Sequence, residues 1–134
     1  MKSLIMLLCL IVSNAALSQT KRDYENFMHK FQQFYNANKA DSLCNLGSNS
    51  LGMSKNALFT AKELEQCKKE YGNIVSFKYI KVDTVYSKNK RTLIKVYGSN
   101  KNFIMSVSLD KENKFENFNF SLKTPYTESL LLKD

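Results

Sequence analysis

Apolar residues in the first half of the chain recur with the period of an α-helix. Between residues 21 and 36 they fall on one stripe of a 3.6-residue helix. Thr20 followed by Asp23 is a typical helix start, because the two side chains can cap free backbone N–H groups. The stripe consists of Tyr24, Phe27, Met28, Phe31, Phe34 and Tyr35. We predict a helix over residues 21–36 whose aromatic stripe either forms core or lines a ligand cavity.

Two further helices are predicted before the pattern changes. Leu43 and Leu46 indicate a short helix, and a Ser-, Asn- and Gly-rich stretch after them predicts a surface loop. Thr60 and Glu63 have the spacing of a capping box, in which each residue caps a backbone N–H of the other. Gly72 is a natural helix stop. We therefore predict a well-bounded helix between Thr60 and Gly72.

From residue 74 onward the apolar period changes to two, which is typical of strands that are buried on one face. The parity shifts by one near Tyr79 and Ile80, which indicates a β-bulge. Short polar turns separate the alternating segments, so the strands are expected to form an antiparallel meander. The predicted strands cover residues 74–82, 92–97, 103–109 and 118–122. Helices followed by strands give an α+β fold with N-terminal helices packed on a four-stranded antiparallel sheet.

The N-terminus carries the features of an export signal. Lys2 precedes an uncharged run over residues 4–12, and Ala16 and Ser18 suit a signal peptidase that cleaves before Gln19. The run is shorter than the roughly 20 residues that span a membrane. We predict a signal peptide (residues 1–18) and a single exported domain (residues 19–134), periplasmic or extracellular and free of the membrane after cleavage. The alternatives are an uncleaved anchor and a buried helix.

Composition and charge limit the classes of partner that the protein is expected to bind. The chain has 134 residues, of which 43% are hydrophobic, and its nine Phe and seven Tyr argue against disorder. The formal net charge is +8, which falls by one when Lys2 is removed with the signal peptide. Much of this charge lies in predicted turns, whereas the aromatic residues point inward, so we expect no nucleic-acid partner. Such turn residues are Lys88, Lys90, Arg91, Lys111 and Lys114.

Two cysteines, Cys44 and Cys67, remain after signal cleavage. In an oxidising compartment an even pair is a candidate disulfide. Cys67 shares the apolar face of its predicted helix and is expected to point inward. Two buried free thiols are the alternative, because nothing in the sequence fixes the distance between the two residues.

The sequence assigns no catalytic residue, no cofactor and no metal. His29 is the only histidine, and it falls on the polar face of its helix. One histidine and two separated cysteines do not form a spaced ligand set, and the chain has neither a phosphate loop nor a dinucleotide fingerprint. An enzyme hypothesis rests on Asp83, which would act with a tyrosine if its carboxylate projected into a helix-covered cavity.

The order of these elements resembles a known family. An aromatic helix ending in Phe34-Tyr35-Asn36 precedes a capped helix that leads into Tyr71-Gly72-Asn73-Ile74-Val75-Ser76, and the meander closes near Phe120-Ser121-Leu122-Lys123. This pattern is similar to the small exported DUF3887-type domains of the NTF2-like, cystatin-like group. The resemblance implies a curved antiparallel sheet around a long helix, with a cavity between them. It implies no catalytic residues for this chain.

We therefore expect an exported, non-catalytic domain that binds a small apolar ligand or a partner protein between the aromatic helix and the sheet. The alternatives are an NTF2-like enzyme that uses Asp83 and an accessory domain that forms a homodimer through an open sheet face. The candidate lining residues of the ligand site are Phe31, Tyr35, Phe77, Tyr97 and Phe120.

Overall fold

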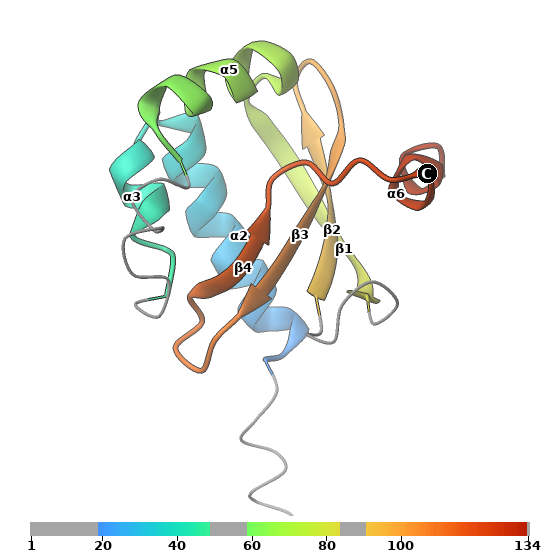
Figure 1. The fold of residues 1–134 in the computed structure, drawn as a ribbon, viewed down its shortest axis with the longest axis horizontal. Helices are drawn as coiled ribbons and strands as arrows, with labels where there is room; N and C mark the ends of the chain where they lie inside the picture. The colour runs from blue at the N-terminus through green and yellow to red at the C-terminus, as the bar shows by residue number, and fades with distance from the viewer. Residues whose placement is uncertain (1–18, 49–58, 84–90, 134) are drawn as a thin grey trace, which may run out of the picture.

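Figure 1 shows the computed structural model, which describes residues 19–48, 59–83 and 91–133. The side chains of residues 81–83 and the predicted signal peptide lie outside the described residues. In the described residues three helices come first, then four strands, then a C-terminal helix. Their bounds are α2 Lys21–Asn36, α3 Ala40–Cys44, α5 Ala61–Tyr71, β1 Ile74–Asp83, β2 Arg91–Gly98, β3 Phe103–Leu109, β4 Phe115–Asn119 and α6 Pro125–Leu131.

The helix starts are as predicted. At α2, the Thr20 hydroxyl accepts a hydrogen bond from the Asp23 backbone N–H at 3.3 Å, and the Thr20 N–H donates to the Asp23 carboxylate at 2.7 Å. Thr60 and Glu63 form the same reciprocal pair at α5. Gly72 follows α5 with a φ of 76°, a conformation that favours glycine. The capping box and the glycine stop therefore set the two ends of α5.

The strands form one sheet in the order β1-β2-β3-β4, with every neighbouring pair antiparallel. The predicted meander is confirmed. The register of β1 against β2 shifts between Tyr79 and Lys81, which confirms the predicted bulge. A second irregularity lies between Ile74 and Ser76.

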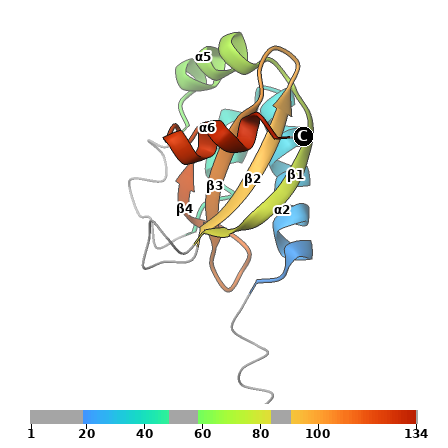
Figure 2. The ribbon, with the colours of Figure 1, turned by 90° about the vertical axis from the view of Figure 1, so that its right-hand side faces the viewer.

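Helix α2 packs against one face of the sheet and α6 lies on the opposite face (Figures 1 and 2). The main core lies between α2 and the sheet. Side chains of Ile94, Val96, Met105 and Val107 point into it and are almost fully buried. Residues that alternate with these point to the other face, where α6 crosses. The α+β fold class is thus confirmed, and the described residues include one helix, α6, that was not predicted.

The fourth strand begins and ends earlier than predicted. It covers Phe115–Asn119, so Phe120 and Leu122 follow the strand instead of lying in it. Its register against β3 skips Glu116, which makes that residue an extra one on β4. Because of this bulge Phe115 and Phe118 both contact the core although they are three residues apart. Simple alternation therefore missed the start of the strand.

Helix α6 was not predicted from the sequence. Its N-cap is Thr124, whose hydroxyl accepts from the Thr127 backbone N–H at 3.1 Å, and Pro125 occupies the first turn. Proline suits that position because its missing N–H would have no helical partner there. Thr124-Pro125 is the available signal, but the segment is short, and the sequence pattern assigns no element after the strand over residues 118–122.

Candidate ligand-binding cleft

Three of the five predicted lining residues come together inside the core. The ring of Phe120 lies 5.7 Å from that of Tyr35 and 6.3 Å from that of Phe31. Phe31 and Tyr35 are almost fully buried, and the Tyr35 hydroxyl donates to the Gly72 carbonyl at 3.1 Å. Burial raises the pKa of Tyr35 well above its usual value. These side chains pack on one another, so their contacts are those of a core.

The other two predicted lining residues lie on opposite faces of the sheet, Phe77 packed against the edge of the core and Tyr97 pointing away from it. Phe77 is half-buried on β1, and its ring meets the exposed His29 ring edge-on at 5.0 Å. Tyr97 lies next to Val96 on β2 and points to the opposite face, where the Lys95 ammonium is 5.4 Å from its ring. The five side chains therefore do not line one site.

A surface cleft of about 490 Å³ lies where α5, the turn between β2 and β3, and α6 meet. Its apolar side chains come from β3, from the segment after β4, and from the last residue of α6 and its C-cap. They are Phe103, Ile104, Leu122, Leu131 and Leu132. Leu132 is 87% exposed, which is unusual for a large apolar side chain. The cleft therefore combines a buried apolar floor with an exposed apolar rim.

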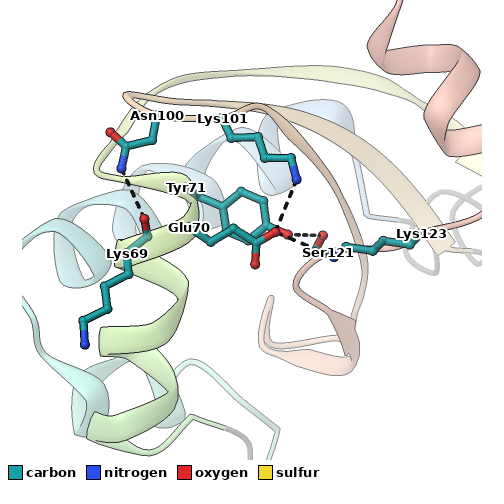
Figure 3. A network of polar contacts seen from close by, with 7 residues as sticks. All are labelled: Lys69, Glu70, Tyr71, Asn100, Lys101, Ser121 and Lys123. Atoms are coloured by element: carbon teal, nitrogen blue, oxygen red, sulfur yellow. Dashed lines mark hydrogen bonds and ion pairs between the residues drawn. The ribbon is translucent and has the colours of Figure 1, made fainter.

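Polar groups gather at the α5 end of this cleft (Figure 3). The hydroxyls of Tyr71 and Ser121 are 2.8 Å apart. The Glu70 carboxylate lies 3.4 Å from the Lys101 ammonium and 3.7 Å from that of Lys123. Glu70 also has a hydrogen bond with the Tyr71 side chain. Since a carboxylate only accepts, Tyr71 donates to Glu70 and accepts from Ser121.

This network keeps Glu70 ionised. The pKa of Glu70 is lowered below its usual value, first by the hydrogen bond from Tyr71. The hydrogen bond from Lys101 and the positive charges of Lys101 and Lys123 lower it further. Glu128 lines the cleft and Glu70 pairs with its two lysines, so two carboxylates balance the two ammonium groups. The cleft can therefore hold a molecule with an apolar body and a polar end that accepts hydrogen bonds from lysine. Sequence reasoning missed these residues because Lys101, Ser121 and Lys123 belong to turns and linkers.

A larger hollow of about 690 Å³ lies between α3 and the start of α5. Its lining is mainly polar, with residues such as Asn38, Asp41, Asn45 and Thr60. It lacks the continuous apolar floor of the cleft at α6, and we therefore take the latter as the candidate site.

The two cysteines are free thiols in this structure. The Cys44 thiol donates to the Phe59 carbonyl at 3.4 Å and is buried. Cys67 is half-buried on α5, and burial raises the pKa of its thiol. Of the two alternatives left open by the sequence, the structure contains the pair of thiols.

The remaining sequence hypotheses concern catalysis, metals and membranes. Asp83 is the last residue of β1, and its side chain lies outside the described residues. Within the described part of the chain, no three His, Cys, Asp or Glu side chains are grouped so that they could hold a metal ion. No helix of the described residues is long and apolar enough to cross a membrane. Neither a family model, nor a curated protein, nor a solved structure matches this chain.

Proposed function

We propose that this chain is an exported, non-catalytic domain that binds a small amphiphilic molecule in the cleft beside α6. The observation that carries the proposal is the combination of an apolar floor with two ammonium groups and two hydroxyls at one end of the same hollow. Small-molecule sites typically have this composition, since apolar contacts supply affinity and a few polar groups fix orientation.

The apolar part of the ligand would lie on Ile104, Leu122 and Leu131. The volume of about 490 Å³ is within the usual range for small-molecule pockets. Covering Leu132, which is 87% exposed, would remove apolar surface from water and favour binding. A ligand with no apolar body would gain little from this part of the cleft.

The polar end of the ligand would accept hydrogen bonds from Lys101 and Lys123. Each ammonium has three N–H donors, and their ion pairs with Glu70 leave donors for a further acceptor. The ammonium groups of Lys101 and Lys123 repel a cationic end, and the Glu70 carboxylate that could attract it is already paired with both lysines. The proposed ligand class is therefore an aliphatic carboxylate or alcohol, not an aliphatic amine.

Isothermal titration calorimetry with decanoate, decanol and decylamine, each below its micelle concentration, tests this function. Decanoate and decanol should bind, and decylamine should bind at least about tenfold more weakly. The Lys101→Gln/Lys123→Gln variant should lose this preference, while the control Lys30→Gln/Lys111→Gln, which removes two exposed charges elsewhere, should keep it. Equal binding of all three probes, or of none, contradicts the proposal.

Export and family belong to the same proposal. The segment with Lys2, Ala16 and Ser18 supports cleavage before Gln19. The order of α2, α3 and α5 before the four strands is what the resemblance to the NTF2-like, cystatin-like group implies. Mass spectrometry of the secreted protein tests the first part, since any N-terminus other than Gln19 contradicts the cleavage site.

The homodimer hypothesis required an open face of the sheet. Helix α6 lies on the face away from α2, so the face that such a dimer would use carries a helix (Figure 2). This observation favours the small-molecule function over association through the sheet.

A further inference from the structure

A second group of polar side chains lies on the α6 side of the sheet, where β2 begins and β3 ends. The Arg91 side chain is half-buried there, and its Nε atom is buried without a hydrogen-bond partner. The hydroxyls of Ser106 and Ser108 are also buried without partners, and these residues are only 1% and 5% exposed. We propose that this group, which we call the Arg91 row, binds a small oxyanion such as phosphate or a carboxylate.

The strand register brings these side chains together. Ser108 pairs with Asn117 on β4, and the Arg91 guanidinium donates to the Asn117 side-chain carbonyl at 3.1 Å. Because β3 lies between β2 and β4, the Arg91 side chain must cross β3 beside Ser108 to reach Asn117. Ser106 is two residues from Ser108 on the same strand and points to the same face. Three buried donors without partners therefore lie at neighbouring positions on the α6 face of the sheet.

Buried polar groups are almost always hydrogen-bonded, so a cluster without partners calls for an explanation. A hydroxyl without a hydrogen-bond partner could donate to any acceptor, but the Arg91 guanidinium also brings a permanent positive charge to this group. No carboxylate among the described side chains forms an ion pair with Arg91. A neutral acceptor would satisfy the donors and leave that charge uncompensated, whereas an oxyanion meets both requirements.

The geometry of the guanidinium suits such a ligand. Its Nε–H and one N–H of the neighbouring terminal nitrogen lie on one edge, which can hold two oxygens of one carboxylate or phosphate. Nη2 makes the bond to Asn117 and still has a second N–H. The Asn117 amide thus positions the guanidinium, and the Nε–H remains for the ligand.

This inference does not depend on the ligand of the cleft. Ile104 belongs to the cleft floor, and Ser108 lies four residues further along β3. At about 3.4 Å per residue the two positions are roughly 14 Å apart. The cleft and the Arg91 row are therefore separate sites on one face, and either can fail without the other.

A nitrogen-15 NMR titration of the full secreted chain tests the proposal, because the arginine Nε–H gives a resolved signal. The probes are sodium phosphate and sodium acetate, with sodium chloride at equal ionic strength as the control. We expect the Arg91 Nε–H signal to shift saturably with phosphate or acetate and not with chloride. No saturable shift with either oxyanion overturns the proposal.

Two variants extend this test. The Ser106→Ala/Ser108→Ala variant keeps the Arg91 charge but removes two proposed donors to the ligand. It should therefore bind the oxyanion at least about fivefold more weakly. Without oxyanion it should be as stable as the parent, because the lost hydroxyls had no partners. Arg91→Gln should abolish the thermal stabilisation that phosphate gives the parent beyond chloride, whereas Arg22→Gln, at an exposed position, should retain it. Equal phosphate stabilisation of the parent, Arg91→Gln and Arg22→Gln contradicts the proposal.

Asp83 supplies the competing explanation, because the β1–β2 register places it opposite Arg91. If the Asp83 carboxylate is itself the partner of the guanidinium, the parent will not respond to oxyanions. The Arg91 Nε–H signal will then move on Asp83→Asn substitution instead. That result overturns the proposal, whereas a titration that persists in the Asp83→Asn variant supports it.

Discussion

The hydroxyl groups of Tyr71 and Ser121 lie 2.8 Å apart and join two segments that are fifty residues apart in the chain. Tyr71 is the last residue of α5, and Ser121 follows β4. The Tyr71 ring also lies 4.5 Å from that of Phe103 and 5.6 Å from that of Phe120. This contact ties the helix to the sheet at the polar end of the cleft.

Replacing Tyr71 by Phe should therefore destabilise the protein without opening the core. The ring stays, but Ser121 and Glu70 each lose a hydrogen bond, which should lower the free energy of unfolding by about 1 kcal/mol. Urea denaturation of Tyr71→Phe, Ser121→Ala and the double variant measures this. The double variant should cost less than the sum of the two single variants, because both remove the same contact. Strict additivity would show that the hydroxyls do not interact.

Gly98→Ala should be strongly destabilising although Gly98 is the last residue of β2. An added Cβ would lie 2.2 Å from the Tyr71 carbonyl oxygen and 2.5 Å from that of Lys101. Both obstacles are backbone atoms, so we expect a loss of about 1–3 kcal/mol in the free energy of unfolding. In the comparison variant Gly47→Ala, the nearest atom is the tip of the Phe115 ring at 2.9 Å, and the loss should be smaller. Thermal unfolding of both variants distinguishes these outcomes, and a reversed order would refute the argument.

Asp110 should give the protein a pH-dependent stability. Partial burial opposes its ionisation, but hydrogen bonds from Ser48 and from the backbone N–H groups of Lys114 and Glu112 lower its pKa overall. A carboxyl whose pKa is lowered by folding stabilises the native state above its unfolded pKa of about 3.9. That stabilisation is lost as the pH falls through the lower, folded-state pKa.

Asp110→Asn should remove this contribution. At neutral pH the variant should be about 1 kcal/mol less stable than the parent, and the difference should shrink as the pH falls below 4. Denaturation midpoints across the acidic range measure the effect. Glu116→Gln, at an exposed position on β4, is the control and should follow the parent. A constant difference between Asp110→Asn and the parent at all pH values would contradict the assignment.

The two thiols should react slowly in the native protein. Cys44 is buried, so a reagent has little access to it. Burial raises the pKa of Cys67, so little of its reactive thiolate is present. Iodoacetamide should modify both residues rapidly only after unfolding in urea. Mass spectrometry of the native protein, kept under oxidising conditions, provides the decisive comparison. A mass lower by two hydrogens, with no alkylation after unfolding, would show the disulfide instead.

Local signals in the sequence predicted much of the fold. The spacing of Thr60 and Glu63 predicted the start of α5, and Gly72 predicted its end. The parity shift near Tyr79 predicted the bulge in β1. In each case a few neighbouring residues determine the backbone, so the interaction can be recognised without knowing the rest of the chain.

Features that depend on distant partners were not predicted. The bulge at Glu116 exists only in the pairing of β4 with β3. Helix α6 is short and depends on tertiary contacts, including the Lys95 ammonium that donates to the carbonyls of Leu131 and Lys133 at 3.4 and 2.9 Å. The cleft also depends on the register, because its polar end combines residues from α5, a strand turn and the segment after β4. Aromatic spacing alone selected Phe77 and Tyr97 without showing that they point away from one another.

The order of the strands has a consequence for folding. Since each strand pairs with its neighbour in sequence, the sheet can form through successive hairpins that require only short loop closures. Helix α6 comes last in the chain and contacts the sheet mainly through β3, so it can detach while the four strands stay paired. We therefore expect the amide hydrogens of α6 to exchange with solvent much sooner than those of β2 and β3. Local detachment of this helix would open the cleft without global unfolding.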